Sequence, residues 1–161
     1  MHPSARRFIA SAVADHPPHG RVLECGSLNV NGGVRELFDG CWYTGIDYRE
    51  GLGVDLIATC HALPFPDASF AWVVCSSMLE HDERPWLSAA EMLRVLKPGG
   101  QLVVTAPGFG WPRHDFPGDL WRFSGEAFGV LFRFGEAVAV ERLEEADDGD
   151  GPDTRLWAKR L

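Results

Sequence analysis

The sequence lacks any apolar run long enough to cross a membrane. Its longest run, residues 70–75 (FAWVVC), has the length of a single β-strand, whereas a membrane-spanning helix needs about 20 apolar residues. The first residues, 1–7, also lack the long apolar stretch of a secretory signal. We therefore expect a cytoplasmic protein that makes no membrane contact.

Paired cysteines are also missing. The 161-residue chain is long enough to bury a core without disulfide bonds, and single cysteines beside apolar runs are typical of reduced, buried thiols. His16 and His19 have the spacing of metal ligands, but two prolines separate them and no second pair lies nearby. We therefore expect neither a disulfide framework nor a metal site. The four single cysteines are Cys25, Cys41, Cys60 and Cys75.

The chain has no excess of basic residues. It contains 15 Lys and Arg against 23 Asp and Glu, which gives a net charge of −8 and disfavours binding to nucleic acid or to an anionic membrane. Much of this acidity lies in one segment, 144–153, which holds no Lys or Arg. We expect that segment to be a solvated loop without a catalytic role.

What is present is an alternation of strand-like and helix-like segments. Short apolar runs predict strands at 21–25, 42–46, 54–57, 70–75 and 102–106, and helical periodicity predicts helices at 3–14, 32–38, 85–96 and 124–132. Segments 137–143 and 154–159 have no helix between them, so an antiparallel C-terminal hairpin is expected. The pattern indicates an α/β fold with a doubly wound, mostly parallel sheet. We expect one domain over 1–161, with residues 1–20 as N-terminal helix and linker.

The first strand leads into a turn of small residues that begins at Gly26. A strand, a tight turn and a helix N-terminus hold nucleotide-like ligands on free backbone N–H groups. Asp47 follows the second strand, 21 residues after Gly26, where an acidic residue can bind ribose hydroxyls. A plain strand–turn–helix with a surface aspartate is the alternative. The Gly-x-Gly-x-x-Gly motif of dinucleotide-binding proteins is absent.

Five segments then follow in an order that resembles one family. They are 22–26 (VLECG), 43–47 (YTGID), 62–70 (ALPFPDASF), 79–81 (LEH) and 93–100 (LRVLKPGG). Together they are similar to the class I S-adenosylmethionine-dependent methyltransferases, and especially to the group called methyltransferase type 11. The resemblance covers about 21–106 well and the rest loosely. It implies a Rossmann-like methyltransferase fold and S-adenosylmethionine as cofactor.

The resemblance also implies a set of cofactor-binding residues. Glu24 would lie near the methionine amino group and Asp47 would hold the ribose. The chain departs from the family pattern at Leu28 and Val30, which replace glycines, and near Thr59, where an acid is missing. The full expected set is Glu24, Gly26, Ser27, Leu28, Asn29, Asp47, Tyr48, Cys60, His61, Ser76 and Ser77.

The acceptor site is expected beneath the long segment 107–123, which follows the fifth strand and resembles a stretch found in many small members of the family. His81 and His114 are the candidate catalytic residues, as proton acceptors or, for His81, simply as a residue that enters a helix. Trp111, Asp119 and Arg122 are candidate substrate contacts. The favoured alternative for Asp119 and Arg122 is an ion pair that pins the loop.

The leading hypothesis is methyl transfer from S-adenosylmethionine to a small-molecule acceptor, with no nucleic acid or membrane partner. The type of acceptor atom and the oligomeric state stay open. One alternative is a non-catalytic subunit of the same fold that binds the cofactor or a partner. A nicotinamide-dependent oxidoreductase is disfavoured by the missing glycines and by segment 62–70.

Overall fold

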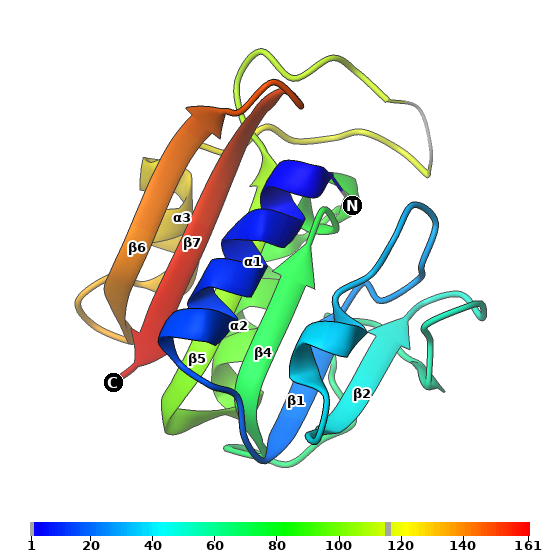
Figure 1. Cartoon of the computed structure of the whole chain (residues 1–161), viewed down its shortest axis with the longest axis vertical. Coiled ribbons are helices and arrows are strands. Elements are labelled where there is room, and N and C mark those ends of the chain that lie inside the picture. The colour runs from blue at the N-terminus through cyan, green and yellow to red at the C-terminus, as the bar shows by residue number, and fades with distance from the viewer. Residues whose placement is uncertain (1, 115–116) are drawn as a thin grey trace.

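The computed structural model describes residues 2–114 and 117–161. A seven-stranded sheet runs through it in the order β3-β2-β1-β4-β5-β7-β6, as Figure 1 shows. Strands β3, β2, β1, β4 and β5 are parallel, and β7 is antiparallel to both β5 and β6. The elements are α1 (Pro3–Asp15), β1 (Arg21–Cys25), η1 (Arg35–Phe38), β2 (Trp42–Asp47), β3 (Leu56–Ile57), β4 (Phe70–Ser76), η2 (Leu79–His81), α2 (Pro85–Val95), β5 (Leu96–Pro107), α3 (Gly125–Phe132), β6 (Val138–Asp147) and β7 (Pro152–Arg160).

Helices cover both faces of the sheet. Helix α1 lies on one face and α2 and α3 lie on the other (Figure 1). Strand β4 supplies side chains to both layers, because alternate residues of a strand point to opposite faces. Trp72 and Val74 pack on the α1 side, whereas Val73 and Cys75 pack on the α2 side. The unbroken apolar run of this strand therefore reflects burial on both faces, and the doubly wound α/β prediction with its C-terminal hairpin is confirmed.

The helix predicted over 32–38 is wrong. Only the short 3-10 helix η1 forms there, and the chain between β1 and η1 is a projecting loop, drawn in blue in Figure 1. Gly32 has a φ of 103°, which no helix accommodates. The Asn29 side chain accepts a hydrogen bond from the Gly32 N–H at 2.8 Å, and the Asn29 N–H donates to the Leu52 carbonyl at 2.8 Å. These bonds hold the segment as a loop.

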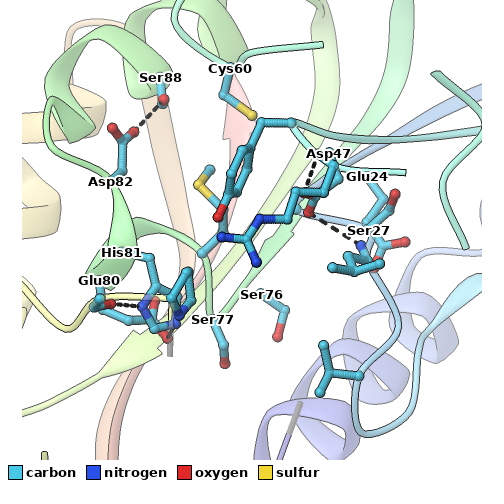
Figure 2. A pocket seen from close by; sticks show the side chains of 18 of the residues that line it. Glu24, Ser27, Asp47, Cys60, Ser76, Ser77, Glu80, His81, Asp82 and Ser88 are labelled. Atoms are coloured by element: carbon cyan, nitrogen blue, oxygen red, sulfur yellow. Dashed lines mark hydrogen bonds and ion pairs between the residues drawn. The ribbon is translucent and has the colours of Figure 1, made fainter. Parts of the chain in front are cut away.

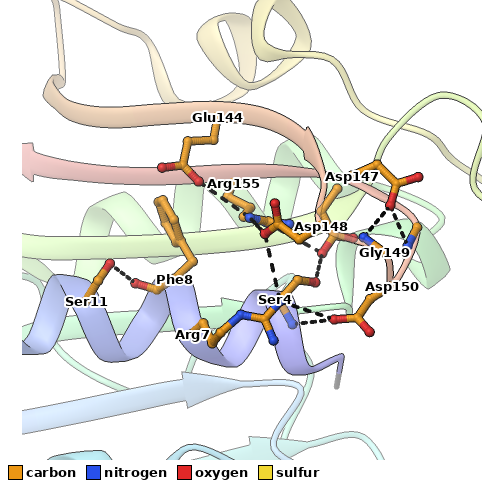
Figure 3. Close-up of polar contacts among 12 residues, drawn as sticks. Ser4, Arg7, Phe8, Ser11, Glu144, Asp147, Asp148, Gly149, Asp150 and Arg155 are labelled. Carbon is orange, nitrogen blue, oxygen red and sulfur yellow. Dashed lines mark hydrogen bonds and ion pairs between the residues drawn. The ribbon is translucent and has the colours of Figure 1, made fainter.

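The acidic segment 144–153 is also different from the solvated loop that was predicted. Strand β6 extends to Asp147 and β7 begins at Pro152, so most of the segment belongs to the hairpin. The buried Arg155 is the physical reason, since its guanidinium lies 2.7 Å from Asp148 and 3.5 Å from Glu144. Figure 3 shows these acids gathered around Arg155 and the start of α1. The segment is therefore a structural part of the fold.

Outside the hairpin, β5 and β3 differ most from the bounds predicted for them. Strand β5 begins at Leu96, directly after α2, rather than at residue 102, because Leu96 already pairs with Phe70 of β4 before a register shift. Strand β3 is confined to Leu56–Ile57. Within 2–114 and 117–161, every helix is too short or too polar to cross a bilayer.

Candidate active site

A cavity of about 660 Å³ lies at the carboxyl ends of the parallel strands, at the edge of the sheet where α/β proteins bind ligands. Its volume is in the range of cofactor sites, about 300–1,000 Å³. Figure 2 shows polar side chains of its lining, which come from β1, β2, β4, η2 and α2 and from the segments between these elements. Residues predicted from the sequence that line it are Glu24, Gly26, Ser27, Leu28, Asp47, Tyr48, Cys60, His61, Ser76, Ser77, His81 and His114.

Glu24 is the second-last residue of β1 and lies at the floor of the cavity. Its carboxylate accepts a hydrogen bond of 2.7 Å from the Tyr43 hydroxyl, and only 8% of the residue is exposed. Burial raises the pKa of Glu24, and the bond from Tyr43 opposes that rise. One carboxylate oxygen thus has a fixed partner, and the group faces the cavity as an acceptor for a cationic or N–H group.

The turn after β1 is built around Gly26. Its φ is 77°, and a Cβ added there would lie 2.7 Å from the Met78 Cβ, so a glycine is required. The N–H groups of Gly26 and Ser27 both donate to the Ile46 carbonyl at 2.9 Å. The expectation that these N–H groups point freely at a ligand is therefore wrong. The Ser27 hydroxyl, by contrast, is buried and has no hydrogen-bond partner among the described residues.

Asp47 ends β2 beside this turn. It accepts hydrogen bonds from the backbone N–H groups of Arg49 at 3.0 Å and Leu28 at 3.4 Å. These bonds orient the carboxylate at the cavity wall, where Figure 2 shows it near Ser27 and Glu24. Tyr48, more than half exposed, follows at the rim. The neighbouring residue Asn29 lies outside the described lining, because its side chain bonds within its own loop.

The opposite wall is formed by a polar network around Asp82. His61 Nε2 lies 2.5 Å from Asp82 Oδ1, and the Ser88 hydroxyl donates to Asp82 Oδ2 at 2.5 Å. Since a carboxylate only accepts, His61 Nε2 carries a proton. Ser76 shares a hydrogen bond of 2.9 Å with Thr105, and Ser77 has a φ of 51°. The sequence did not identify Asp82 or Ser88, because neither belongs to a motif.

His81 and His114, the two candidate catalytic residues, meet at the far end of the cavity. Their Nε2 atoms lie 3.3 Å apart, and their rings are nearly perpendicular. His81 Nδ1 bonds to the Gly118 carbonyl. Burial lowers the pKa of His81, which favours the neutral ring that a proton acceptor needs.

Glu80 lies beside these histidines and was not identified from the sequence. Its side chain is 1% exposed, and its Oε1 lies 3.7 Å from His81 Nε2. Burial raises the pKa of Glu80 to about 8. Glu80 belongs to the LEH motif, but no periodicity in that short stretch indicates that the side chain turns inward.

The loop after β5 is pinned by an ion pair between Asp119 and Arg122. The two Arg122 terminal nitrogens lie 2.5 and 2.6 Å from the Asp119 oxygens, and the guanidinium holds the pKa of Asp119 well below its usual range. The alternative favoured for Asp119 and Arg122, an ion pair that pins the loop, is therefore confirmed. Neither residue lines the described cavity, nor does Trp111, which packs on His2. Residues Pro117, Gly118 and Leu120 line it instead.

Comparison with known proteins gives one consistent family. A profile described as a methyltransferase domain matches residues 29–104. An uncharacterized methyltransferase of Mycobacterium tuberculosis is 31% identical over 148 residues, covering 81% of this chain and 53% of the relative. A demethylmenaquinone methyltransferase of Renibacterium salmoninarum is 49% identical over 118 residues, and the match covers 65% of this chain and 49% of the relative. The chain thus spans about half the length of these curated relatives.

Solved structures share the fold at low identity. The 1,6-didemethyltoxoflavin-N1-methyltransferase of Burkholderia thailandensis, solved with its acceptor and S-adenosylhomocysteine, has a TM-score of 0.77 at 15% identity and covers 99% of this chain and 79% of its own. The N-methyltransferase NodS of Bradyrhizobium japonicum, solved with S-adenosylhomocysteine, has a TM-score of 0.71 at 13% identity, with coverages of 98% and 85%. From its motifs and the match over residues 29–104, the chain is similar to methyltransferases of the type 11 group, and it shares the fold of the solved S-adenosylmethionine-dependent methyltransferases.

Proposed function

We propose that this protein binds S-adenosylmethionine across the ends of β1, β2 and β4 and transfers its methyl group to a small-molecule acceptor. The observation that carries the proposal is the placement of Glu24 and Asp47. Glu24 is the second-last residue of β1 and Asp47 the last residue of β2, and both carboxylates face the same cavity from these adjacent parallel strands. His81 and His114 lie at its other end.

The residues present fit the cofactor. Glu24 would accept hydrogen bonds from the methionine ammonium and Asp47 from the ribose hydroxyls, since carboxylates bond strongly to such donors. The unpartnered Ser27 hydroxyl offers a further polar contact. Gly26 leaves the space that a side chain would fill. The cofactor supplies an already activated methyl group, so the protein mainly aligns the acceptor and excludes water.

The acceptor would enter beneath the loop after β5. Pro117, Gly118 and Leu120 cover that end of the cavity, and the Asp119–Arg122 pair fixes the loop that carries them. The names of two related proteins, a demethylmenaquinone and a didemethyltoxoflavin methyltransferase, indicate ring-shaped acceptors for those enzymes. This supports a small, ring-shaped acceptor here, held against His81 and His114.

Calorimetric titration with S-adenosylhomocysteine and, separately, with NAD tests the cofactor. We expect a single S-adenosylhomocysteine site and no NAD binding; NAD binding alone would favour the oxidoreductase. An acceptor screen that detects S-adenosylhomocysteine release then tests catalysis. With an identified acceptor, His114→Ala should lower turnover strongly, by about 10²–10⁴-fold if His114 accepts the proton, and leave S-adenosylhomocysteine affinity unchanged. A protein that binds the cofactor but never releases product would instead be a non-catalytic subunit.

A further inference from the structure

Three metal-ligating side chains converge at the acceptor end of the cavity. Glu80 and His81 lie in η2, directly after β4, and His114 lies in the loop after β5. Strands β4 and β5 are parallel neighbours, so their carboxyl ends bring these segments together. The ligand atoms of the three side chains all lie within 4.8 Å of one another. We propose that Glu80, His81 and His114 bind a divalent transition-metal ion.

The hydrogen bonds of His81 leave its Nε2 free to ligate a metal. His81 Nδ1 bonds to the backbone carbonyl of Gly118, and a carbonyl oxygen only accepts hydrogen bonds. Nδ1 therefore carries the proton of the neutral ring, and Nε2 presents a lone pair. An N–H bonded to a backbone carbonyl is also the usual arrangement that orients a metal-ligating histidine.

His114 offers the second nitrogen ligand. Its Nδ1 lies 3.6 Å from Asp119 Oδ2, too far for a hydrogen bond, and has no hydrogen-bond partner among the described residues. A proton on Nδ1 would face this carboxylate, and Nε2 would then be available to a metal ion.

Without a metal, the 3.3 Å contact between the two Nε2 atoms is a hydrogen bond from one ring to the other, and a bound cation would replace that bond. In a tetrahedral site with metal–nitrogen distances of about 2.0–2.1 Å, neighbouring ligand atoms lie about 3.3–3.4 Å apart. The separation of the two Nε2 atoms therefore equals one edge of such a site.

Glu80 supplies the third ligand and the charge. Its side chain is 1% exposed, and neither carboxylate oxygen has a hydrogen-bond partner in the described part of the chain. A buried carboxylate without a partner is costly, and a bound cation would provide that partner. The proposal reverses the expectation from sequence that the chain holds no metal, because Glu80-His81 and His114 are 33 residues apart and show no ligand spacing.

Two histidines and one carboxylate suit Zn²⁺, Fe²⁺, Mn²⁺ and related ions, and they leave a coordination position open to the cavity. There the ion would bind an oxygen of the acceptor and lower its pKa. The acceptor proton would pass to solvent, and the O–CH₃ bond would form as the S–CH₃ bond breaks. This catalytic part rests on the proposed function, whereas metal binding itself does not.

The test uses the metal-free full chain without cofactor or acceptor. Zn²⁺ is titrated by calorimetry, and Co²⁺ binding is followed by the visible absorption of a four- or five-coordinate ion. We expect one site, with affinity lowered more than tenfold in His81→Ala, His114→Ala and Glu80→Gln. The matched control is His19→Ala, which removes an exposed histidine and should leave the affinity unchanged. Circular dichroism melting checks that each variant folds.

Equal Zn²⁺ affinity in the wild type and in folded Glu80→Gln and His81→Ala would overturn the proposal, as would loss of binding in His19→Ala alone. If the histidine variants do not fold, the wild-type Co²⁺ spectrum decides, since a spectrum of hydrated Co²⁺ contradicts nitrogen ligands. S-adenosylhomocysteine titration of the same samples separates the two proposals. If S-adenosylhomocysteine still binds but no metal site is found, only the metal-site proposal is refuted and the proposed function stands.

Discussion

The Ser4 hydroxyl donates a 3.0 Å hydrogen bond to the carboxylate of Asp153, a residue 149 positions further along the chain. Both side chains are buried. The Ser4 N–H also donates to Asp150 at 3.0 Å, so the first turn of α1 is fastened to the β6–β7 hairpin at two points (Figure 3).

Ser4→Ala should therefore destabilise the fold. The substitution leaves the Asp153 carboxylate buried with one bond fewer, which costs about 1–3 kcal/mol. Ser11→Ala is the comparison on the same helix, and its loss should be smaller because Ser11 is half-buried and water can replace its hydroxyl. Denaturant unfolding measures both variants. Equal losses in the free energy of unfolding would show that the burial of Ser4 does not increase the cost of removing its hydroxyl.

Gly26→Ala should disturb the cofactor turn. The new Cβ would meet the Met78 Cβ at 2.7 Å in a backbone conformation with φ of 77°, and a non-glycine residue in this left-handed region costs about 1–2 kcal/mol. We expect a lower melting temperature and weaker S-adenosylhomocysteine binding. Gly26→Ala combined with Met78→Gly should recover part of the loss in cofactor affinity, since it removes the clashing Met78 atoms but keeps the backbone strain at residue 26. If the double variant binds S-adenosylhomocysteine no better than Gly26→Ala, the contact with residue 78 is not the cause of the loss.

Asp47→Ala should weaken S-adenosylhomocysteine binding more than tenfold. Loss of a charge-assisted hydrogen bond costs about 1.5–3 kcal/mol. Glu50→Ala is the matched control, because Glu50 is an exposed acid in the same connection outside the described lining. Unchanged calorimetric affinity in Asp47→Ala would remove this residue from the site.

The stability of the ligand-free protein should depend on pH through Glu24. Burial raises the pKa of Glu24 in the folded state, so folding favours the protonated carboxyl. The contribution of the Glu24 carboxyl to folding stability is fully present below about pH 4.3, the pKa of a glutamate in the unfolded chain. This contribution is lost as the pH rises through the higher pKa that Glu24 has in the folded protein. Glu24→Gln should therefore gain stability relative to the wild type as pH rises from 4 to 7. A difference in melting temperature that does not change with pH would contradict the burial effect.

Much of the sheet could be predicted from the sequence because its core strands are unbroken apolar runs. Val22, Trp72 and Val103 lie on one face of the sheet because alternate residues of a strand point to opposite faces. The carboxylates Glu24 and Asp47 were found because a strand end fixes where they lie. The helix at 32–38 was overestimated because apolar periodicity outweighed two consecutive glycines in the prediction.

The acidic hairpin and Glu80 show what sequence patterns do not carry. Acids at 144–153 resemble a solvated segment until the buried Arg155, from the next strand, is placed among them. In the sequence, Glu80 is only the central residue of the LEH motif. Its carboxylate is buried because η2 packs against the loop after β5. Both features depend on contacts between elements, which local patterns do not encode.

Strand β7 lies between β5 and β6, and α1 packs across it. The amino-terminal helix therefore has no complete docking surface until the final strand has been synthesised. Because a ribosome synthesises the chain from its N-terminus, α1 emerges before β7. The apolar face of α1 therefore stays exposed until β7 is available to cover it. Contacts this distant in sequence slow folding. Docking of α1 onto the sheet should therefore be a late step in the folding of these elements.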